Sequence, residues 1–227
     1  MALAHSPRIV TDGLVLCLDA GNTKSYPGSG TTWSDLSGQG NNGELVNSPT
    51  YNSSNLGYFQ FVTDDYARIP NNTDLDTQTP SVEVWVKTNA TTQNGFWFEK
   101  GTVNSQYSLF QEGSFIRWRQ NFAGGITNLS TATATYMNTT NWYQVVGTYT
   151  SGSRKLYING VQVNSDTQSG TISTNSGGMS IGAFGGYSGS RSYYYNGNLA
   201  VCRVYNKVLT ASEIQQNYNA LRSRFGI

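Results

Sequence analysis

Short apolar or alternating runs recur along this chain, and turn-forming residues separate them. Alternation with a period of two is typical of half-buried β-strands, because successive side chains of a strand point to opposite faces. Such runs predict strands over ten segments: 13–19, 57–62, 81–87, 95–100, 106–111, 114–120, 142–149, 154–160, 178–184 and 198–205. No sizeable stretch among them has the periodicity of a helix.

Two local signals add a turn and a helix. Asn159–Gly160 lies between two apolar runs, and this pair readily adopts the two positive φ values of a type I′ hairpin turn. Segment 210–222 predicts a C-terminal helix, because Thr210 and Glu213 form a capping box and apolar residues then recur at helical spacing.

The expected fold is therefore all-β, a two-sheet antiparallel jelly-roll sandwich with a short C-terminal α-helix. The aromatic content of 13% excludes a disordered chain. Proline is scarce and no linker divides the strands, so we expect one domain over residues 1–227, with an N-terminal tail over 1–11.

Charge and reactive residues exclude several function classes. A formal net charge of +1 with 12% charged residues gives no broad basic surface for nucleic acid or a membrane. His5 is the one histidine, which removes nearly every Ser–His–Asp, Cys–His or histidine-ligated zinc site. Cys17 and Cys202 are two reduced core thiols, or one bridge that joins the terminal strands.

Several motifs occur together in a recognisable order. Segments 81–88, 142–163, 179–183 and 195–218 resemble laminin-G-like modules of the concanavalin A-like lectin/glucanase superfamily. The opening segment 12–45 looks like the N-terminal signature of such modules in tailed-phage and marine bacterial proteins. The resemblance covers most of the chain and implies two sheets stacked face to face. It does not imply one activity, because this fold hosts lectins, glycanases, adhesins and inert virion parts.

A glycan-binding surface needs aromatic platforms and polar groups on an exposed strand face. Alternation places Glu83, Trp85 and Lys87 on one face of their strand and three valines on the other. We expect the valines in the core and Trp85 on the open side, where a sugar ring can stack on it, unless a loop covers it. In segment 114–120, Trp118 lies on one face of the strand, and Phe115, Arg117 and Arg119 lie together on the other face.

Segment 182–197 is a second candidate surface. Its tyrosine, serine, glycine and arginine content is typical of adaptable binding loops. The residues that we expect to contact a glycan or a protein partner are Tyr187, Arg191, Tyr193, Tyr194 and Tyr195. The alternative is a long hairpin loop whose last tyrosines enter the next strand.

A glycanase would need two acids across a cleft, about 5 Å apart in retaining enzymes and more in inverting ones. The comparable strands offer only Glu83 and Glu99, and neither has a second acid at i+2 or i+4 on its own face. We therefore expect no catalytic residues and no enzyme activity, with an acid pair from different strands as the alternative.

Many members of the family that the chain resembles carry a structural calcium, with acids in the last strand. Ala200 and Val201 stand at those positions here, so the resemblance implies that this site is lost. Segments 63–66 and 71–76 are rich in Asp and Asn and either assemble another oxygen site or form surface turns. We expect neither a metal nor a cofactor.

The glycine-rich segment 31–45 resembles a ligand loop but lacks the residues that bind. A phosphate loop needs lysine after its last glycine, where Glu44 stands, and a calcium loop needs glutamate at its twelfth position, which is Val46. Asp35 and Ser37 can instead accept hydrogen bonds from nearby backbone N–H groups. The segment is predicted to be a rigid corner.

The function expected from this resemblance is a non-enzymatic virion surface or structural protein, such as a capsid decoration, tail or fibre component. It would dock on other virion proteins of the capsid or tail and contact cell-surface or environmental glycans. The first residues lack the apolar core of a signal peptide, so we expect synthesis in the host cytoplasm and display on the virion surface. The competing interpretations are a bacterial lectin or adhesin and a polysaccharide hydrolase.

Overall fold

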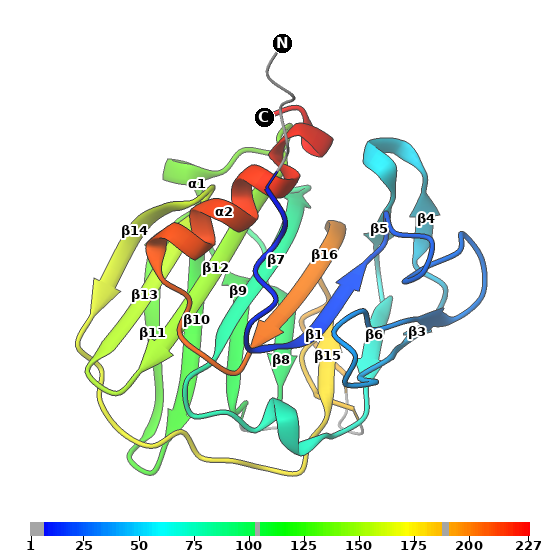
Figure 1. Cartoon of the computed structure of the whole chain (residues 1–227). Helices are drawn as coiled ribbons and strands as arrows, with labels where there is room; N and C mark the ends of the chain where they lie inside the picture. The colour runs from blue at the N-terminus through cyan, green and yellow to red at the C-terminus, as the bar shows by residue number, and fades with distance from the viewer. Residues whose placement is uncertain (1–6, 103–104, 188–190) are drawn as a thin grey trace.

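The computed structural model describes residues 7–102, 105–187 and 191–227, which form two antiparallel sheets packed face to face (Figure 1). The first sheet has the order β14-β13-β12-β7-β16-β5-β4, and β1 also pairs with β16. Its strands are β1 (Leu14–Asp19), β4 (Thr50–Asn52), β5 (Tyr58–Phe61), β7 (Ser81–Thr88), β12 (Tyr143–Thr150), β13 (Ser153–Ile158), β14 (Val161–Asp166) and β16 (Gly197–Tyr205).

The second sheet has the order β11-β10-β9-β8-β15-β6-β3-β2. Its strands are β2 (Thr32–Trp33), β3 (Gly43–Val46), β6 (Tyr66–Ile69), β8 (Gly95–Lys100), β9 (Tyr107–Glu112), β10 (Phe115–Phe122), β11 (Gly125–Ala132) and β15 (Met179–Ile181). The helices are α1 (Thr133–Tyr136) and α2 (Ala211–Leu221), with 3₁₀ turns η1 (Ser54–Leu56), η2 (Thr73–Leu75) and η3 (Arg222–Phe225).

The predicted jelly-roll sandwich is confirmed, and each of the ten expected segments contains a strand. The hairpin between β13 and β14 has the predicted positive φ values, 50° at Asn159 and 79° at Gly160. The ten segments miss β2, β3, β4 and β6, which are short, and β11 and β14, which are polar and little buried. The Asn159–Gly160 hairpin signal nevertheless pointed to a strand at β14.

Apolar side chains fill the space between the sheets. Val82, Val84 and Val86 point inward from β7, as alternation predicted, and each is fully buried. Trp118 enters the same core from the second sheet and lies against the backbone of β12. A Cβ at Gly147 would lie 2.4 Å from the Trp118 ring, so glycine is required where this ring packs on β12.

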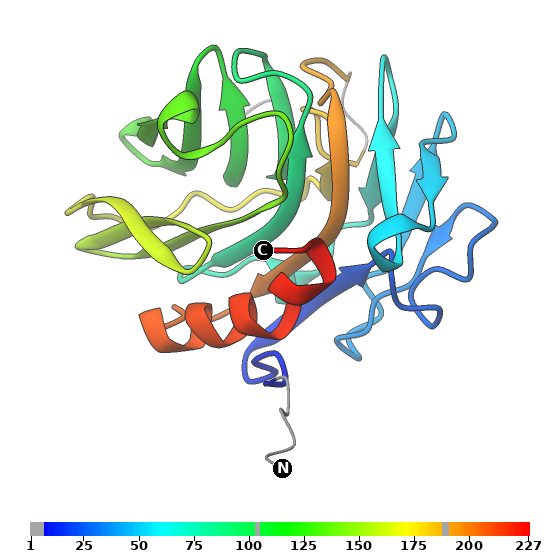
Figure 2. The ribbon, with the colours of Figure 1, turned by 90° about the horizontal axis from the view of Figure 1, so that it is seen from above.

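Helix α2 lies against the outer face of the first sheet (Figures 1 and 2). Its capping box between Thr210 and Glu213 is confirmed. Of the expected N-terminal tail, residues 1–6 lie outside the described ranges. Val10 is buried against this helix, and its N–H donates to Asn217 Oδ1 at 2.8 Å. No helix within the described ranges is long and apolar enough to cross a bilayer.

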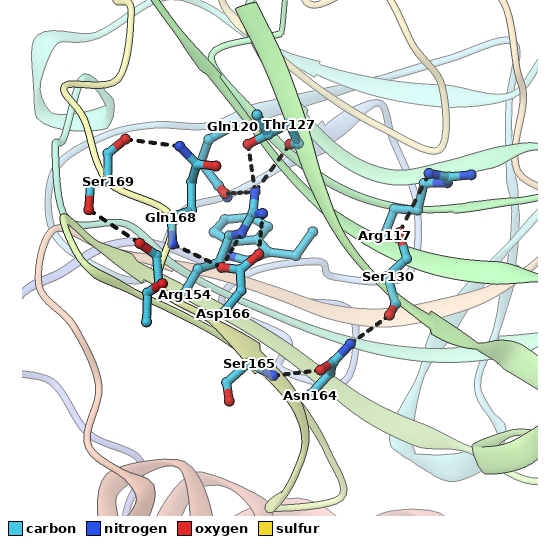
Figure 3. A network of polar contacts seen from close by, with 12 residues as sticks. Arg117, Gln120, Thr127, Ser130, Arg154, Asn164, Ser165, Asp166, Gln168 and Ser169 are labelled. Atoms are coloured by element: carbon cyan, nitrogen blue, oxygen red, sulfur yellow. Dashed lines mark hydrogen bonds and ion pairs between the residues drawn. The ribbon is translucent and has the colours of Figure 1, made fainter. Parts of the chain in front are cut away.

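A buried arginine joins the two sheets at the edge where β11 and β14 meet (Figure 3). Arg154 of β13 pairs with Asp166 of β14 and donates to Gln120 Oε1 of β10 at 3.0 Å and Thr127 Oγ1 of β11 at 2.9 Å. Asn164 of β14 adds a hydrogen bond to the Ser130 carbonyl of β11 at 2.7 Å. These bonds fix β11, which lies at the edge of its sheet.

Segment 31–45 is the rigid corner that its sequence predicts. The Asp35 carboxylate accepts hydrogen bonds from the backbone N–H groups of Cys17, Ser37 and Asn41 at 2.8–3.0 Å. Trp33 is fully buried in the core. Both cysteines are buried free thiols, and burial raises the pKa of Cys17 and of Cys202.

Candidate binding face on the second sheet

The structure moves one predicted binding residue into the interior. Trp85 faces away from the valines as predicted, but its side chain is fully buried under the C-terminal segment. Its ring stacks on Phe225 and Tyr218, with centroid distances of 4.6 and 6.0 Å. The prediction of an exposed Trp85 is therefore wrong, because α2 and η3 cover the face on which it lies.

The prediction that Glu83 contacts a ligand is also wrong, because its carboxylate is buried and accepts hydrogen bonds from within the protein. Its carboxylate accepts from Trp85 Nε1, Gln144 Nε2 and Arg203 Nη1, each at 3.0 Å, and from Asn217 Nδ2 at 2.8 Å. Glu83 and Arg203 are both buried. This cluster joins α2 to three strands of the first sheet.

The residues predicted in segment 182–197 divide between interior and surface. Tyr195 is fully buried and its hydroxyl donates to the Lys87 carbonyl at 3.0 Å, so the prediction that it contacts a partner is wrong. Tyr187, Arg191 and Tyr194 are partly exposed, as is the Lys87 side chain at the end of β7. Tyr193 is 53% exposed and is the most prominent ring of this segment.

The outer face of the second sheet carries a polar residue at the same level of every strand. Cross-strand pairing joins these residues into one line from β2 to β11, here called the polar row. Its members are Thr32, Glu44, Arg68, Ser180, Glu99, Ser108, Arg119 and Asn128.

An aromatic cluster adjoins this row, consisting of Phe96, Phe110, Phe184 and Tyr193. Phe96 of β8 stacks on Phe110 of β9 with a centroid distance of 4.1 Å. Phe184 and Tyr193, from the segment between β15 and β16, lie 5.0 and 6.3 Å from the Phe96 ring. The buried rings of Phe96 and Phe110 thus lie beneath the exposed Tyr193 at the surface of the sheet.

Arg119 connects the polar row to the aromatic cluster. Its Cζ lies 4.3 Å from the Phe110 ring centroid and 5.9 Å from that of Phe96. Its Nε donates to Asn128 Oδ1 of β11 at 2.9 Å, and the Arg154 network fixes β11 (Figure 3). The guanidinium is therefore held over an aromatic ring at a distance that favours a cation–π interaction.

Glu99 is the buried carboxylate of the polar row. It accepts hydrogen bonds from Ser105 Oγ at 2.6 Å and from the backbone N–H groups of Gly185 and Gly186. Burial raises its pKa to about 7, although these hydrogen bonds and Arg119 favour the charged form. Gly186 has φ 58°, and a Cβ there would collide with the Gly101 carbonyl, so glycine is required for this contact.

Arginines that lie beside tyrosine rings extend this surface beyond Gly185 and Gly186. Arg68 forms a two-pronged ion pair with Glu44 at 2.8 and 3.0 Å and lies 5.1 Å from the Tyr187 ring centroid. Arg191 lies 4.6 Å from the Tyr66 ring centroid. The surface formed by the polar row, the aromatic cluster and these residues is here called the aromatic–arginine face.

The two glutamates considered for catalysis lie on opposite outer faces of the sandwich. Glu83 faces α2 from the first sheet, whereas Glu99 lies under the 184–187 segment on the second. Both are fully buried, and both carboxylates are occupied by protein donors. They do not form the acid pair across an open cleft that glycoside hydrolysis requires.

A lysine ammonium lies among the oxygens of the Asx-rich segment 71–76. Lys100 Nζ is buried and lies 2.8 Å from Asp76 Oδ1, 2.9 Å from Asn71 Oδ1 and 2.8 Å from the Gly177 carbonyl. Burial lowers the pKa of Lys100, against the opposing effect of Asp76. Within the described ranges no three His, Cys, Asp or Glu side chains gather to hold a metal.

Hollows occur elsewhere on the surface. One of about 590 Å³ is lined in part by Asp19, Leu56 and Arg224, and another of about 560 Å³ by asparagines of segments 40–42 and 70–73. In the first, Arg224 is already paired with Asp19 at 2.7 Å. The aromatic–arginine face differs from them in presenting exposed aromatic surface beside a guanidinium.

Comparison with known proteins places this sandwich in a family. The model of the concanavalin A-like lectin/glucanases superfamily matches residues 61–215. The chain belongs to this superfamily. No curated protein matches the chain.

Solved structures share the fold of this superfamily member at low sequence identity. The binding domain of Paraclostridial Mosquitocidal Protein 1 superposes with a TM-score of 0.71 and 16% identity, over 92% of this chain and 52% of that chain. The binding domain of botulinum neurotoxin DC in complex with rat synaptotagmin II superposes with a TM-score of 0.72 and 15% identity, over 93% of this chain and 52% of that chain. A structure of that domain in complex with SialylT has a TM-score of 0.71 and 15% identity, over the same 93% of this chain and 52% of that chain. This chain therefore spans about half the length of these binding domains.

Sequence reasoning missed the centre of this face. Alternation correctly placed Phe115, Arg117 and Arg119 together, but Phe96 and Phe110 read as ordinary strand residues. A bulge between Phe96 and Phe98 leaves Trp97 in the core and turns Phe96 outward. The signal that was available is the repeated pairing of arginine with aromatic residues on the second-sheet strands.

Proposed function

We propose that this chain is a non-catalytic binding module whose aromatic–arginine face binds a glycan. Aromatic rings stack on the apolar faces of sugars, and planar polar groups fix their hydroxyls. The face offers both, and the two candidate catalytic glutamates are buried and far apart. The solved binding domains that share the fold, one of them in complex with SialylT, support the same class of function.

The conformation of Tyr193 is the observation that carries this proposal. Its backbone has φ 48°, a left-handed value that is uncommon for a bulky residue and often marks a functional position. The Tyr193 carbonyl accepts from the Phe96 N–H at 3.2 Å, and residues 184 and 192 form a β-bridge beside it. The fold thus holds the Tyr193 ring half exposed beside Phe96 and Phe184.

A glycan array compared between the chain and its Tyr193→Ala variant tests this function. We expect binding to at least one glycan and about tenfold weaker binding after the substitution, since a stacked ring contributes about 1.5 kcal/mol. Tyr136→Ala removes an exposed tyrosine at the end of α1 and serves as the control, with unchanged binding expected. Absence of binding to every glycan would reject the function.

We further propose that the module acts on the surface of a phage particle, docked on capsid or tail proteins. The resemblance of segment 12–45 to modules of tailed-phage proteins supports this setting. Protein analysis of purified particles tests it, and we expect the chain at a fixed stoichiometry with a capsid or tail protein. A chain that remains with the bacterial envelope would instead favour the lectin or adhesin interpretation.

A further inference from the structure

We propose that the aromatic–arginine face selects sugars that carry a carboxylate, and that Arg119 is the residue that binds this group. The inference rests on the proposed glycan-binding function and specifies its ligand class. It concerns the guanidinium beside the aromatic cluster rather than the rings themselves.

Ion pairing distinguishes Arg119 from Arg68 of this face and from Arg117 of the same strand. Arg68 is paired with Glu44 and Arg117 with Glu112, with the closest nitrogen–oxygen distance 2.8 Å in each pair. No ion pair within 4.0 Å forms at Arg119 in the described part of the chain. Glu112 and Glu99 act on the Arg119 guanidinium only from beyond ion-pair distance, so an external carboxylate would give it a direct ion pair.

The guanidinium is also oriented before a ligand arrives. Asn128 accepts from its Nε, and Cζ lies over the Phe110 ring. Among the described residues, no hydrogen bond occupies the Nη atoms, which can donate to a ligand. Two parallel N–H groups in a fixed fork match the geometry of a carboxylate. Its partly buried position strengthens the interaction relative to an arginine in free solvent.

Glu99 interacts with Arg119 through space but forms no ion pair with it within 4.0 Å among the described residues. Glu99 is separated from it by Ser108 in the polar row, and both Glu99 oxygens are held by Ser105, Gly185 and Gly186. Arg117 neutralises Glu112, the acid on the neighbouring strand end.

Arg119 and Tyr193 lie beside the same aromatic ring. The Arg119 Cζ and the Tyr193 ring centroid lie 5.9 and 6.3 Å from the Phe96 ring centroid. A pyranose has an apolar face for stacking and can carry its carboxylate at the ring edge. Stacking on Tyr193 would bring such a carboxylate toward Arg119.

Calorimetric titration with two matched ligand pairs tests this inference: 3′-sialyllactose against lactose, and trigalacturonate against its methyl ester. We expect the chain to bind the acidic member of at least one pair at least tenfold more tightly than the neutral member. Arg119→Gln should abolish this preference, and Arg119→Lys should retain part of it because the charge remains but the fork is lost. The control Arg222→Gln, which removes an exposed arginine of η3 away from this face, should change the preference less than threefold.

Equal affinity for the acidic and neutral members of both pairs would overturn the inference and leave the proposed glycan function standing. Preference for the acid that survives in Arg119→Gln would also overturn it. Failure to bind any of the four ligands contradicts the carboxylate proposal, and the glycan array then decides the proposed function separately. The comparison within each pair uses the unaltered chain, so it stays decisive even if a variant fails to fold.

Discussion

Replacing Glu83 with alanine is expected to lower the free energy of unfolding by about 3–5 kcal/mol, the usual cost of breaking a buried ion pair. Arg203 is buried beside it, 3.0 Å from its carboxylate, and would keep its charge without an acidic partner. The donors on Gln144 and Asn217 would lose their acceptor as well. Urea denaturation at pH 7 measures the change.

Two further variants separate this effect from a general loss of charge. Glu112→Ala breaks an ion pair of similar length, 2.8 Å, whose acid is 45% exposed, and should cost less than about 1 kcal/mol. Glu83→Gln keeps a hydrogen-bond acceptor but not the charge and should lie between the two. A Glu83→Ala cost no greater than that of Glu112→Ala would contradict the role assigned to this cluster.

Unfolding free energy is expected to depend on pH through Glu99. Its pKa is about 7 in the folded chain, against 4.5 as the ordinary value. The folded state therefore holds this proton more tightly than the unfolded state, so stability falls as pH rises from 4.5 to about 7. The shift corresponds to about 3 kcal/mol, with little further change from this group outside that range.

Glu99→Gln isolates this contribution. The amide oxygen can accept from Gly185 and Gly186 while its N–H₂ donates to Ser105, so the contacts are kept without a titrating group. Denaturation curves of both proteins at pH 4.5 and pH 8 give the difference. We expect the variant to be the more stable at pH 8 and to lose that advantage at pH 4.5. A difference independent of pH would show that Glu99 does not titrate in this range.

Features that depend on neighbours in sequence were predictable. The hairpin turn at Asn159–Gly160, the capping box of α2 and the inward valines of β7 each follow from a few adjacent residues. The corner at 31–45 follows in the same way, because Asp35 bonds to backbone groups close to it. Local backbone preferences and alternation determine these features without knowledge of the tertiary fold.

What covers a strand face could not be predicted from the strand. Alternation placed Trp85 on the correct side of β7, but Tyr218 and Phe225, which bury it, come from the other end of the chain. The same limit applies to Glu83, whose partner Asn217 is 134 residues away. Polar residues that alternate with the valines of β7 indicate the outer face of the first sheet. The packing of α2 against that face makes it internal.

The candidate site depends on register across many strands. Phe96, Arg119 and Tyr193 are distant in sequence and meet because β8, β9 and β10 align and the β15–β16 segment folds over them. One residue of slippage would turn each side chain to the other face. The bulge between Phe96 and Phe98 shifts the register within β8, so alternation alone places the Phe96 ring on the wrong face.

Mapping a bound acidic glycan by backbone amide NMR shifts tests the central claim most directly. On titration with 3′-sialyllactose or trigalacturonate, whichever binds more tightly, we predict that the largest shifts cluster at Phe96, Phe110, Arg119 and Tyr193. Shifts confined to the face under α2, or to the hollow lined by Asp19 and Arg224, would contradict the assignment of the binding site to the second sheet.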